Sequence, residues 1–194
     1  MHAAQSCKKS ALLLCAAIAL LVLACSSAAK IDTIASPWIG KQLWTATNLR
    51  VFSNQYIYWQ NYLEGKILAV GTQVRLMEIT NKTALFVDNA NTKYLLYWRG
   101  EGESYQADFN QEMKKYFDQQ DPQTAIGKLS EAEQQAIDVG TIQKGMSKAA
   151  VLLACGFPCD QANPMTSDMW LYQANSWKKW AVNFDNGVVI EIWK

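Results

Sequence analysis

GMSKAAVLLACGFP, residues 145–158, is the stretch that decides the fold of the carboxy-terminal part of this chain. Ser147 is a preferred residue at a helix amino terminus, because its side chain accepts a hydrogen bond from the first turn. Gly156 favours the left-handed conformation just past a helix end, and Pro158 prevents continuation. The stretch therefore predicts a short helix over Lys148–Cys155.

This helix needs a partner. Val151 and Cys155 lie one helical turn apart, so one face is apolar and must pack against another element. From Met169 onward apolar residues recur at every second position, a period typical of strands, and Asn186-Gly187 is a strong hairpin signal. The alternating residues are Trp170 and Tyr172, then Trp180, Val182 and Phe184, then Val188, Ile190 and Ile192 against Val189, Glu191 and Trp193. We expect a three-stranded antiparallel meander that covers the helix.

A family resemblance emerges from three stretches. GMSKAAVLLACGFP, then WLYQ at residues 170–173, then WAVNFDNGVVIEI at residues 180–192 resemble the SmpA/OmlA/BamE family of small outer-membrane lipoproteins. The resemblance covers about the last third of the chain, mostly at positions that determine the fold. It implies a domain of two helices and a three-stranded sheet, and a scaffold role whose partner is the β-barrel assembly machinery. The family pattern lacks the two cysteines of this stretch.

The amino-terminal residues 1–24 are typical of a lipoprotein signal peptide. Lys8 and Lys9 precede an apolar run over Ala11–Ala24, about 14 residues long and shorter than the roughly 20 that span a bilayer. Val-Leu-Ala-Cys at residues 22–25 resembles the bacterial lipobox, which predicts lipidation of Cys25. The alternatives are an ordinary signal peptide cut near Ala24 and an uncleaved anchor.

Lipidation makes Cys25 the first mature residue, with residues 25–36 as a small polar tether. Ser26 after the cysteine resembles lipoproteins that are passed to the outer membrane, so we expect the periplasmic face of that membrane. His2 is the one histidine, and its removal excludes histidine-based catalysis and histidine metal ligands. Loss of Lys8 and Lys9 takes the net charge from +1 to −1, which does not favour nucleic-acid binding.

Residues 37–103 form the β-rich part. Five runs rich in β-branched and aromatic residues are separated by turn residues, which predicts a small antiparallel barrel or curved sheet. The segment LAVGTQVRLMEI, residues 68–79, weakly resembles bacterial SH3 domains. The five predicted strands are Leu43–Phe52, Tyr56–Trp59, Gln73–Thr80, Thr83–Val87 and Lys93–Trp98.

Two further helices complete the predicted α+β fold. Aromatic and apolar residues at helical spacing predict an amphipathic helix over Tyr105–Phe117, within a connecting segment of residues 104–121, and we expect its aromatic stripe to pack on the barrel. Ser130-Glu131-Ala132-Glu133 is a capping-box pattern that opens a helix to about Val139, closed by Gly140. Residues 128–194 then form the lipoprotein-like domain.

Two constellations are candidate sites. Cys155 and Cys159 are close in sequence, and we weigh a local structural disulfide, two reduced thiols, and metal or redox chemistry. Trp177, Lys178 and Lys179 lie near a hairpin bend, where exposed Trp and Lys suit a protein partner or lipid headgroups. The carboxylate pair Glu101 and Glu103 lies in a glycine-rich link, and Glu131 and Glu133 serve a helix start and its positive end. Neither pair has an adjacent apolar pocket, so we expect solvated charge instead of catalysis.

The sequence thus predicts a non-enzymatic, lipid-anchored envelope protein that binds another envelope protein, without metal or other cofactor. One alternative is a periplasmic ligand-binding module, whose β-rich half holds peptidoglycan or a cell-wall peptide. The other is an inhibitor of a secreted enzyme, by analogy of fold.

Overall fold

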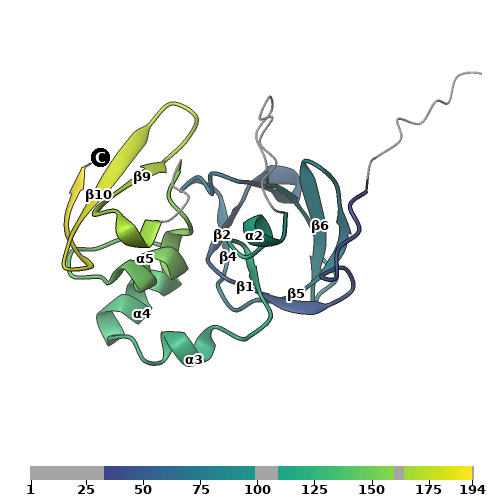
Figure 1. Cartoon of the computed structure of the whole chain (residues 1–194), viewed down its shortest axis with the longest axis horizontal. Coiled ribbons are helices and arrows are strands. Elements are labelled where there is room, and N and C mark those ends of the chain that lie inside the picture. Colours follow the sequence, from purple (N-terminus) through teal and green to yellow (C-terminus); the bar gives the residue numbers. More distant parts are fainter. Residues whose placement is uncertain (1–32, 99–108, 160–163, 194) are drawn as a thin grey trace, which may run out of the picture. The chain divides into compact units, whose positions relative to one another are not determined.

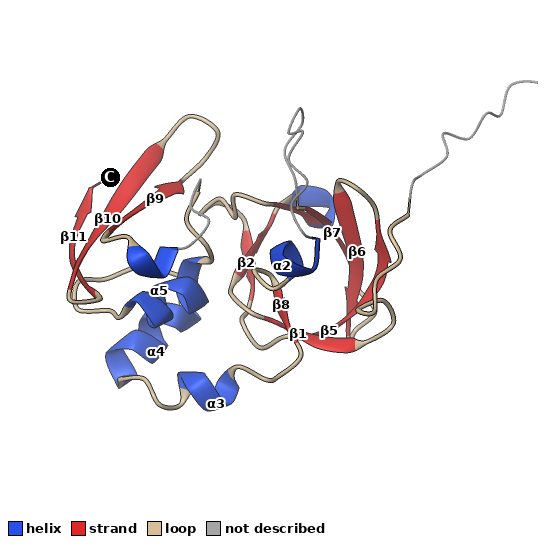
Figure 2. Ribbon diagram, viewed as in Figure 1, coloured by secondary structure: helices blue, strands red, loops and turns tan. Residues whose placement is uncertain are grey.

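A computed structural model describes residues 33–98, 109–159 and 164–193. The described residues all belong to one compact unit. The described chain is a mixed α+β fold with a curled, mainly antiparallel sheet, as predicted at this level (Figures 1 and 2). The predicted signal peptide, Cys25, most of the tether and the link over residues 99–108 lie outside the described residues.

The β-rich part is built around a meander. Its six-stranded sheet has the order β3-β7-β6-β5-β1-β8, and β2 pairs with β4 in a small separate sheet. Contrary to the expectation of a purely antiparallel sheet, β3 runs parallel to β7. The bounds of these strands are β1 Gln42–Thr45, β2 Leu49–Val51, β3 Tyr56–Tyr58, β4 Lys66–Leu68, β5 Gln73–Ile79, β6 Thr83–Asp88, β7 Lys93–Tyr97 and β8 Phe117–Asp118, with a 3-10 turn, η1, at Ser53–Gln55.

The predicted strand over Leu43–Phe52 is wrong as a single element. It breaks between β1 and β2 at Thr47 and Asn48, two buried polar residues. Their side chains bond to helix carbonyls instead of continuing a strand ladder. Strand β4 was not predicted, because KIL is too short to show a period.

The connecting helix ends one turn earlier than predicted, at Met113 instead of Phe117, and its predicted start at Tyr105 lies outside the described residues. Helix α2 spans Phe109–Met113, and the chain then turns into β8, where Phe117 pairs with Thr45 of β1. Met113, Tyr116 and Phe117 are all buried in the core of the β-rich part. The described end of the aromatic stripe therefore packs on the curled sheet, as expected, but a turn and a strand take the place of the last helical turn.

The carboxy-terminal part follows the sequence closely. Ser130 and Glu133 form the predicted capping box, Ser147 caps the next helix, and Gly156 ends it with φ of +80°. Asn186 and Gly187 both have positive φ, as a two-residue hairpin turn requires. The elements are α3 Gln123–Ile126, α4 Glu131–Asp138, α5 Lys148–Cys155, the 3-10 turn η2 Pro164–Thr166, β9 Met169–Gln173, β10 Lys179–Asp185 and β11 Val188–Trp193, with sheet order β11-β10-β9.

A second core lies between the helices and the β9-β10-β11 sheet. Trp170, Tyr172, Trp180 and Val182 face Val151 and its neighbours across this core. In β11 the predicted alternation fails, because a bulge opposite Asn183 and Phe184 shifts the register. Val189 is consequently buried while Val188 and Ile190 are exposed.

Candidate functional site

The tip of the β9–β10 hairpin carries the most exposed large apolar side chain among the described residues. Trp177 is 95% exposed, whereas Trp170 and Trp180 of the flanking strands are buried. Lys178 and Lys179 beside it are also exposed. The structure therefore brings together the three residues that the sequence singled out.

Asn175 orders this tip. Its Oδ1 accepts hydrogen bonds from the backbone N–H groups of Trp177 and Lys178, both at 3.0 Å. Ala174 N–H donates to the Lys178 carbonyl at 2.8 Å and closes the hairpin. Asn175 Nδ2 also donates to Glu64 Oε1 at 3.0 Å, which ties the tip to the β-rich part. Trp177 is thus displayed from a fixed turn, which lowers the entropy lost when a partner binds.

Both members of the cysteine pair are buried. Cys155 and Cys159 are thiols that no disulfide joins, and both are buried. Burial raises the pKa of the Cys155 thiol to about 12, although the Arg50 guanidinium opposes that shift. Since the thiolate is the nucleophile and metal ligand, Cys155 is poorly suited to redox or metal chemistry in this fold.

Side chains of the β-rich part bind the carbonyl ends of both long helices. Thr47 Oγ1 donates to the Leu152 carbonyl at 2.7 Å. Asn48 Nδ2 donates to the Ile137 carbonyl of α4 at 2.6 Å and to the Ala154 carbonyl of α5 at 3.2 Å. We call the polar residues of this contact the seam; they are Thr47, Asn48, Arg50 and Asn61.

The rest of the seam completes the same pattern. Asn61 Nδ2 donates to the Cys155 carbonyl at 3.0 Å, and Arg50 Nη2 donates to the Gly140 carbonyl at 2.6 Å. The last four carbonyls of a helix lack partners within its regular hydrogen-bond ladder. In α5 these are the carbonyls of residues 152–155, and side chains of the seam donate a hydrogen bond to each of them. The sequence analysis missed the seam. The one signal for it was the polar pair Thr47 and Asn48 within the predicted strand Leu43–Phe52.

Glu133 joins the amino ends of the two helices. Its Oε2 accepts from Ser130 in the capping box, while its Oε1 accepts from Ser147 N–H at 2.9 Å and Ser147 Oγ at 2.7 Å. Desolvation alone raises the pKa of this carboxyl, but the hydrogen bonds from Ser147 and Ser130 outweigh it and lower the pKa to about 2. The Glu133 carboxylate is therefore a structural cap, as the capping-box pattern predicts, and it bonds to the second helix while remaining only partly exposed to solvent.

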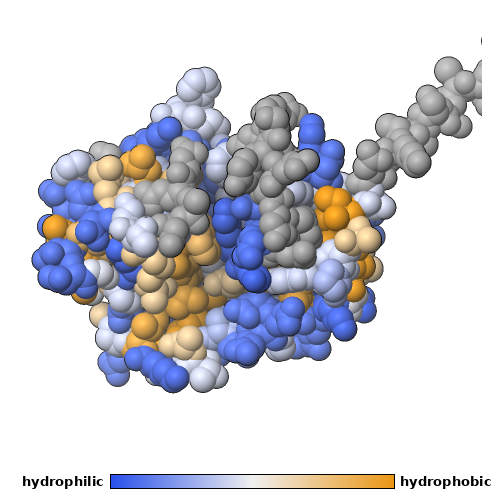
Figure 3. Space-filling view, in the orientation of Figure 1, coloured by the Kyte–Doolittle hydropathy of each residue, from blue (hydrophilic) through white to orange (hydrophobic). Residues whose placement is uncertain are grey.

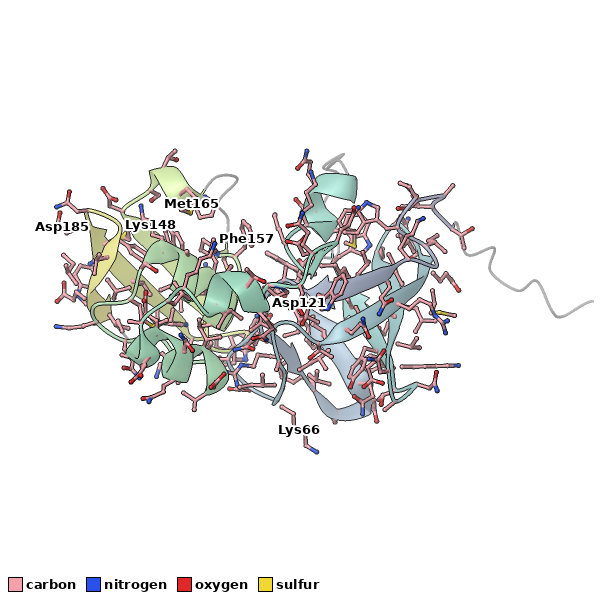
Figure 4. The ribbon with its side chains drawn as sticks, turned by 90° about the horizontal axis from the view of Figure 1, so that it is seen from below. Lys66, Asp121, Lys148, Phe157, Met165 and Asp185 are labelled. Atoms are coloured by element: carbon pink, nitrogen blue, oxygen red, sulfur yellow. The ribbon has the colours of Figure 1, made fainter. Side chains whose placement is uncertain are left out.

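Lys148 is a buried cation at the start of α5. Its Nζ donates to the Met165 carbonyl at 3.1 Å and to Asp168 Oδ1 at 3.2 Å, and it lies 5.3 Å from the centre of the Phe184 ring. Figure 4 shows Lys148 and Met165 at the same end of α5. These contacts account for the buried charge structurally.

An apolar surface is visible over α4 and α5 on the face seen in Figure 3. Leu152 and Leu153 of α5 are half-buried, so they contribute to the second core while keeping part of their surface exposed.

No helix of the described residues is both long and apolar enough to cross a bilayer. The described residues also contain no cluster of three metal-binding side chains of the histidine, cysteine or carboxylate type.

Comparisons of the chain with protein-family models, with curated proteins and with solved structures found no match. Two local features of the chain bear on its function. One is the stretch at residues 22–25 that resembles a lipobox, which lies outside the described residues, and the other is the ordered tip with Trp177, Lys178 and Lys179.

Proposed function

We propose that this protein is a non-enzymatic, lipid-anchored lipoprotein of the outer membrane that binds a protein partner on the periplasmic face. The observation that carries the proposal is the ordered tip, on which Trp177 is 95% exposed beside two exposed lysines. An exposed Trp on a fixed turn is the kind of residue that dominates binding energy at protein interfaces, where it fills a pocket of the partner.

The proposed fold likeness has support at the quoted motif positions. Met146 and Trp170 are buried in the second core, Ser147 caps α5, and Gly156 has positive φ. We therefore propose that residues 128–194 are similar to the SmpA/OmlA/BamE domain, and that the β-rich part is SH3-like. These positions serve the fold, so they carry no argument about activity.

The proposed mechanism is tethering followed by binding. Acyl chains on Cys25 keep the folded part near the bilayer, which raises its effective concentration toward any membrane-bound partner. The tip then engages that partner. By the family resemblance, the partner is the β-barrel assembly machinery.

The proposal is tested by crosslinking in intact cells, followed by affinity purification and mass spectrometry. We compare the wild type with Cys25→Ala and with a tip variant, Trp177→Ala, Lys178→Ala and Lys179→Ala together. Trp193→Ala is the matched control, because Trp193 is 55% exposed but lies outside the tip. Recovery of barrel-assembly proteins that both Cys25→Ala and the tip variant abolish, and that Trp193→Ala leaves intact, is the expected result. Recovery of those proteins from the tip variant at wild-type yield would refute the role of the tip.

A further inference from the structure

Five aromatic rings form a continuous group on the β-rich part. Tyr58 stacks on Tyr97 with ring centres 5.7 Å apart, and Tyr56 also contacts Tyr97, edge-on, with ring centres 5.7 Å apart. Tyr62 and Phe52 adjoin Tyr58 at 5.8 and 5.4 Å. These five residues are called the tyrosine array. Tyr58 is 36% exposed and the other four are half-buried, so the array belongs to the surface.

The hydroxyl groups of the array are available to a ligand. Among the other described tyrosines the hydroxyls serve the fold: Tyr94 donates to Asp88 at 3.0 Å, and Tyr172 donates to the Gly156 carbonyl at 3.0 Å. By contrast, the hydroxyls of Tyr56, Tyr58, Tyr62 and Tyr97 have no hydrogen-bond partner among the described residues. A phenol both donates and accepts hydrogen bonds, so each is an unused polar contact.

No charged side chain among the described residues contacts the array. None of its five residues takes part in a hydrogen bond, an ion pair or a cation–π contact with a charged side chain of the described chain. Burial raises the pKa of the Tyr97 phenol, and the neighbouring Tyr56 and Tyr58 phenols raise it further, so this phenol keeps its proton. This arrangement favours an uncharged ligand over a nucleic acid or an anionic lipid.

Backbone pairing is not offered at this surface. The carbonyls of Tyr56 and Tyr58 already accept hydrogen bonds from Phe52 N–H and Asn61 N–H, both at 2.8 Å. Strand β3 is therefore closed along these carbonyls, although it lies at the end of the six-stranded sheet. A peptide that adds a strand to a sheet edge lacks its main-chain acceptors here.

The turn that leads into the array is strained. Asn54 and Gln55 have φ of +65° and +64°, and both side chains are exposed. Two consecutive non-glycine residues in this region cost free energy, and such strain clusters at ligand sites. Their amides, like the phenols, are neutral groups that donate and accept hydrogen bonds.

We propose that the tyrosine array, with the Asn54-Gln55 turn beside it, binds an uncharged oligosaccharide. Sugar hydroxyls match the unpaired phenols and amides in both donor and acceptor roles, and the ring edges and faces contact the apolar C–H groups of the sugar. This inference is independent of the proposed function, because it involves neither the tip nor the lipid anchor.

The test uses the full chain, purified in detergent, with its tyrosine rings carbon-13 labelled. Chitohexaose and cellohexaose, two neutral hexasaccharides, are titrated while the ring resonances are followed by NMR. We expect one or both to shift the signals of Tyr56, Tyr58, Tyr62 and Tyr97 and to leave Tyr172 unchanged. A Tyr56→Phe, Tyr58→Phe, Tyr97→Phe variant keeps all rings, and we expect its affinity to fall about tenfold or more.

Three results bear on the interpretation. The Trp193→Ala control has an exposed ring removed elsewhere, and unchanged affinity supports a local site. Failure of both hexasaccharides to shift the array signals overturns the proposal. Shifts caused by a proline-rich decapeptide, with none from the sugars, also overturn it and assign the surface to protein recognition. Since crosslinking at the tip is a separate measurement, either proposal can fail alone.

Discussion

The two ends of helices α4 and α5 are capped by hydrogen bonds of different range along the sequence. At the amino ends, Ser130, Glu133 and Ser147 bond to residues within the same short segment of chain. At the carboxyl ends, Asn48 bonds to carbonyls 89 and 106 residues later in the sequence. The amino ends of the helix pair are therefore capped by residues nearby in sequence, whereas the carboxyl ends obtain their hydrogen-bond donors from the β-rich part.

The largest effect is expected when the β-rich part is removed altogether. We expect residues 128–194 alone to lack a cooperative urea transition, whereas residues 33–194 keep one. The reason is that several helix carbonyls lose their side-chain partners and bond to water instead. Each such exchange loses about 0.5–1.5 kcal/mol, against a typical total stability of about 5–15 kcal/mol. Val70 of the β-rich part is also lost from the second core. A cooperative transition in the fragment would contradict this dependence.

A single substitution should weaken the same end. Asn48→Ala leaves the Ile137 and Ala154 carbonyls and the Val70 N–H without their side-chain partner. We expect the free energy of unfolding to fall by about 3–5 kcal/mol, measured by urea denaturation. Asn89→Ala is the control, because Asn89 makes only an exposed side-chain bond and should change stability by less than about 0.5 kcal/mol. A loss below about 1 kcal/mol at Asn48 would show that the seam is not needed.

The same contrast explains what the sequence could predict. The caps at Ser130 and Ser147 and the Asn186-Gly187 turn follow from residues a few positions apart, and all of them are found. The parallel pairing of β3 with β7 and the bulge at Asn183 depend on strands brought together from a distance, which no local period encodes.

The candidate sites also differ in whether their residues are close together in the sequence. Trp177, Lys178 and Lys179 were predicted because a hairpin bend exposes its own residues, and the structure places them at an ordered tip. The tyrosine array was missed, because Tyr97 joins Tyr56 and Tyr58 only through the pairing of β7 with β3. The lipidation of Cys25 stays a prediction.

The amino ends offer a smaller effect that depends on pH. Glu133→Gln replaces one of two accepting oxygens by a donor, so one helix cap is lost. We expect a loss of about 1–2 kcal/mol at pH 7, reduced from the full pKa shift because the side chain is partly exposed to solvent.

The sign of the pH effect follows from the lowered pKa. The carboxyl titrates at about 2 when folded and near 4.5 when unfolded, so it stabilises the fold fully above about pH 4.5. That contribution declines as the pH falls toward 2. Urea denaturation at pH 7, 4.5 and 3 should therefore show a difference between wild type and Glu133→Gln that shrinks as the pH falls. A constant difference would assign the effect to packing instead of charge.

The smallest predicted effect concerns the turn beside the tyrosine array, where the backbone of Gln55 adopts an unfavourable conformation. Gln55 has φ of +64°, a region in which glycine is unstrained, whereas Gln42 in strand β1 does not have positive φ. We expect Gln55→Gly to raise the free energy of unfolding by up to about 1 kcal/mol, and Gln42→Gly to lower it by about 0.5–1 kcal/mol. Urea denaturation of the two variants measures this opposite sign. If the strain serves the array, Gln55→Gly also weakens chitohexaose binding while stabilising the fold, because stability and binding place opposite demands on this turn. Equal signs for the two substitutions would show that the turn stores no strain.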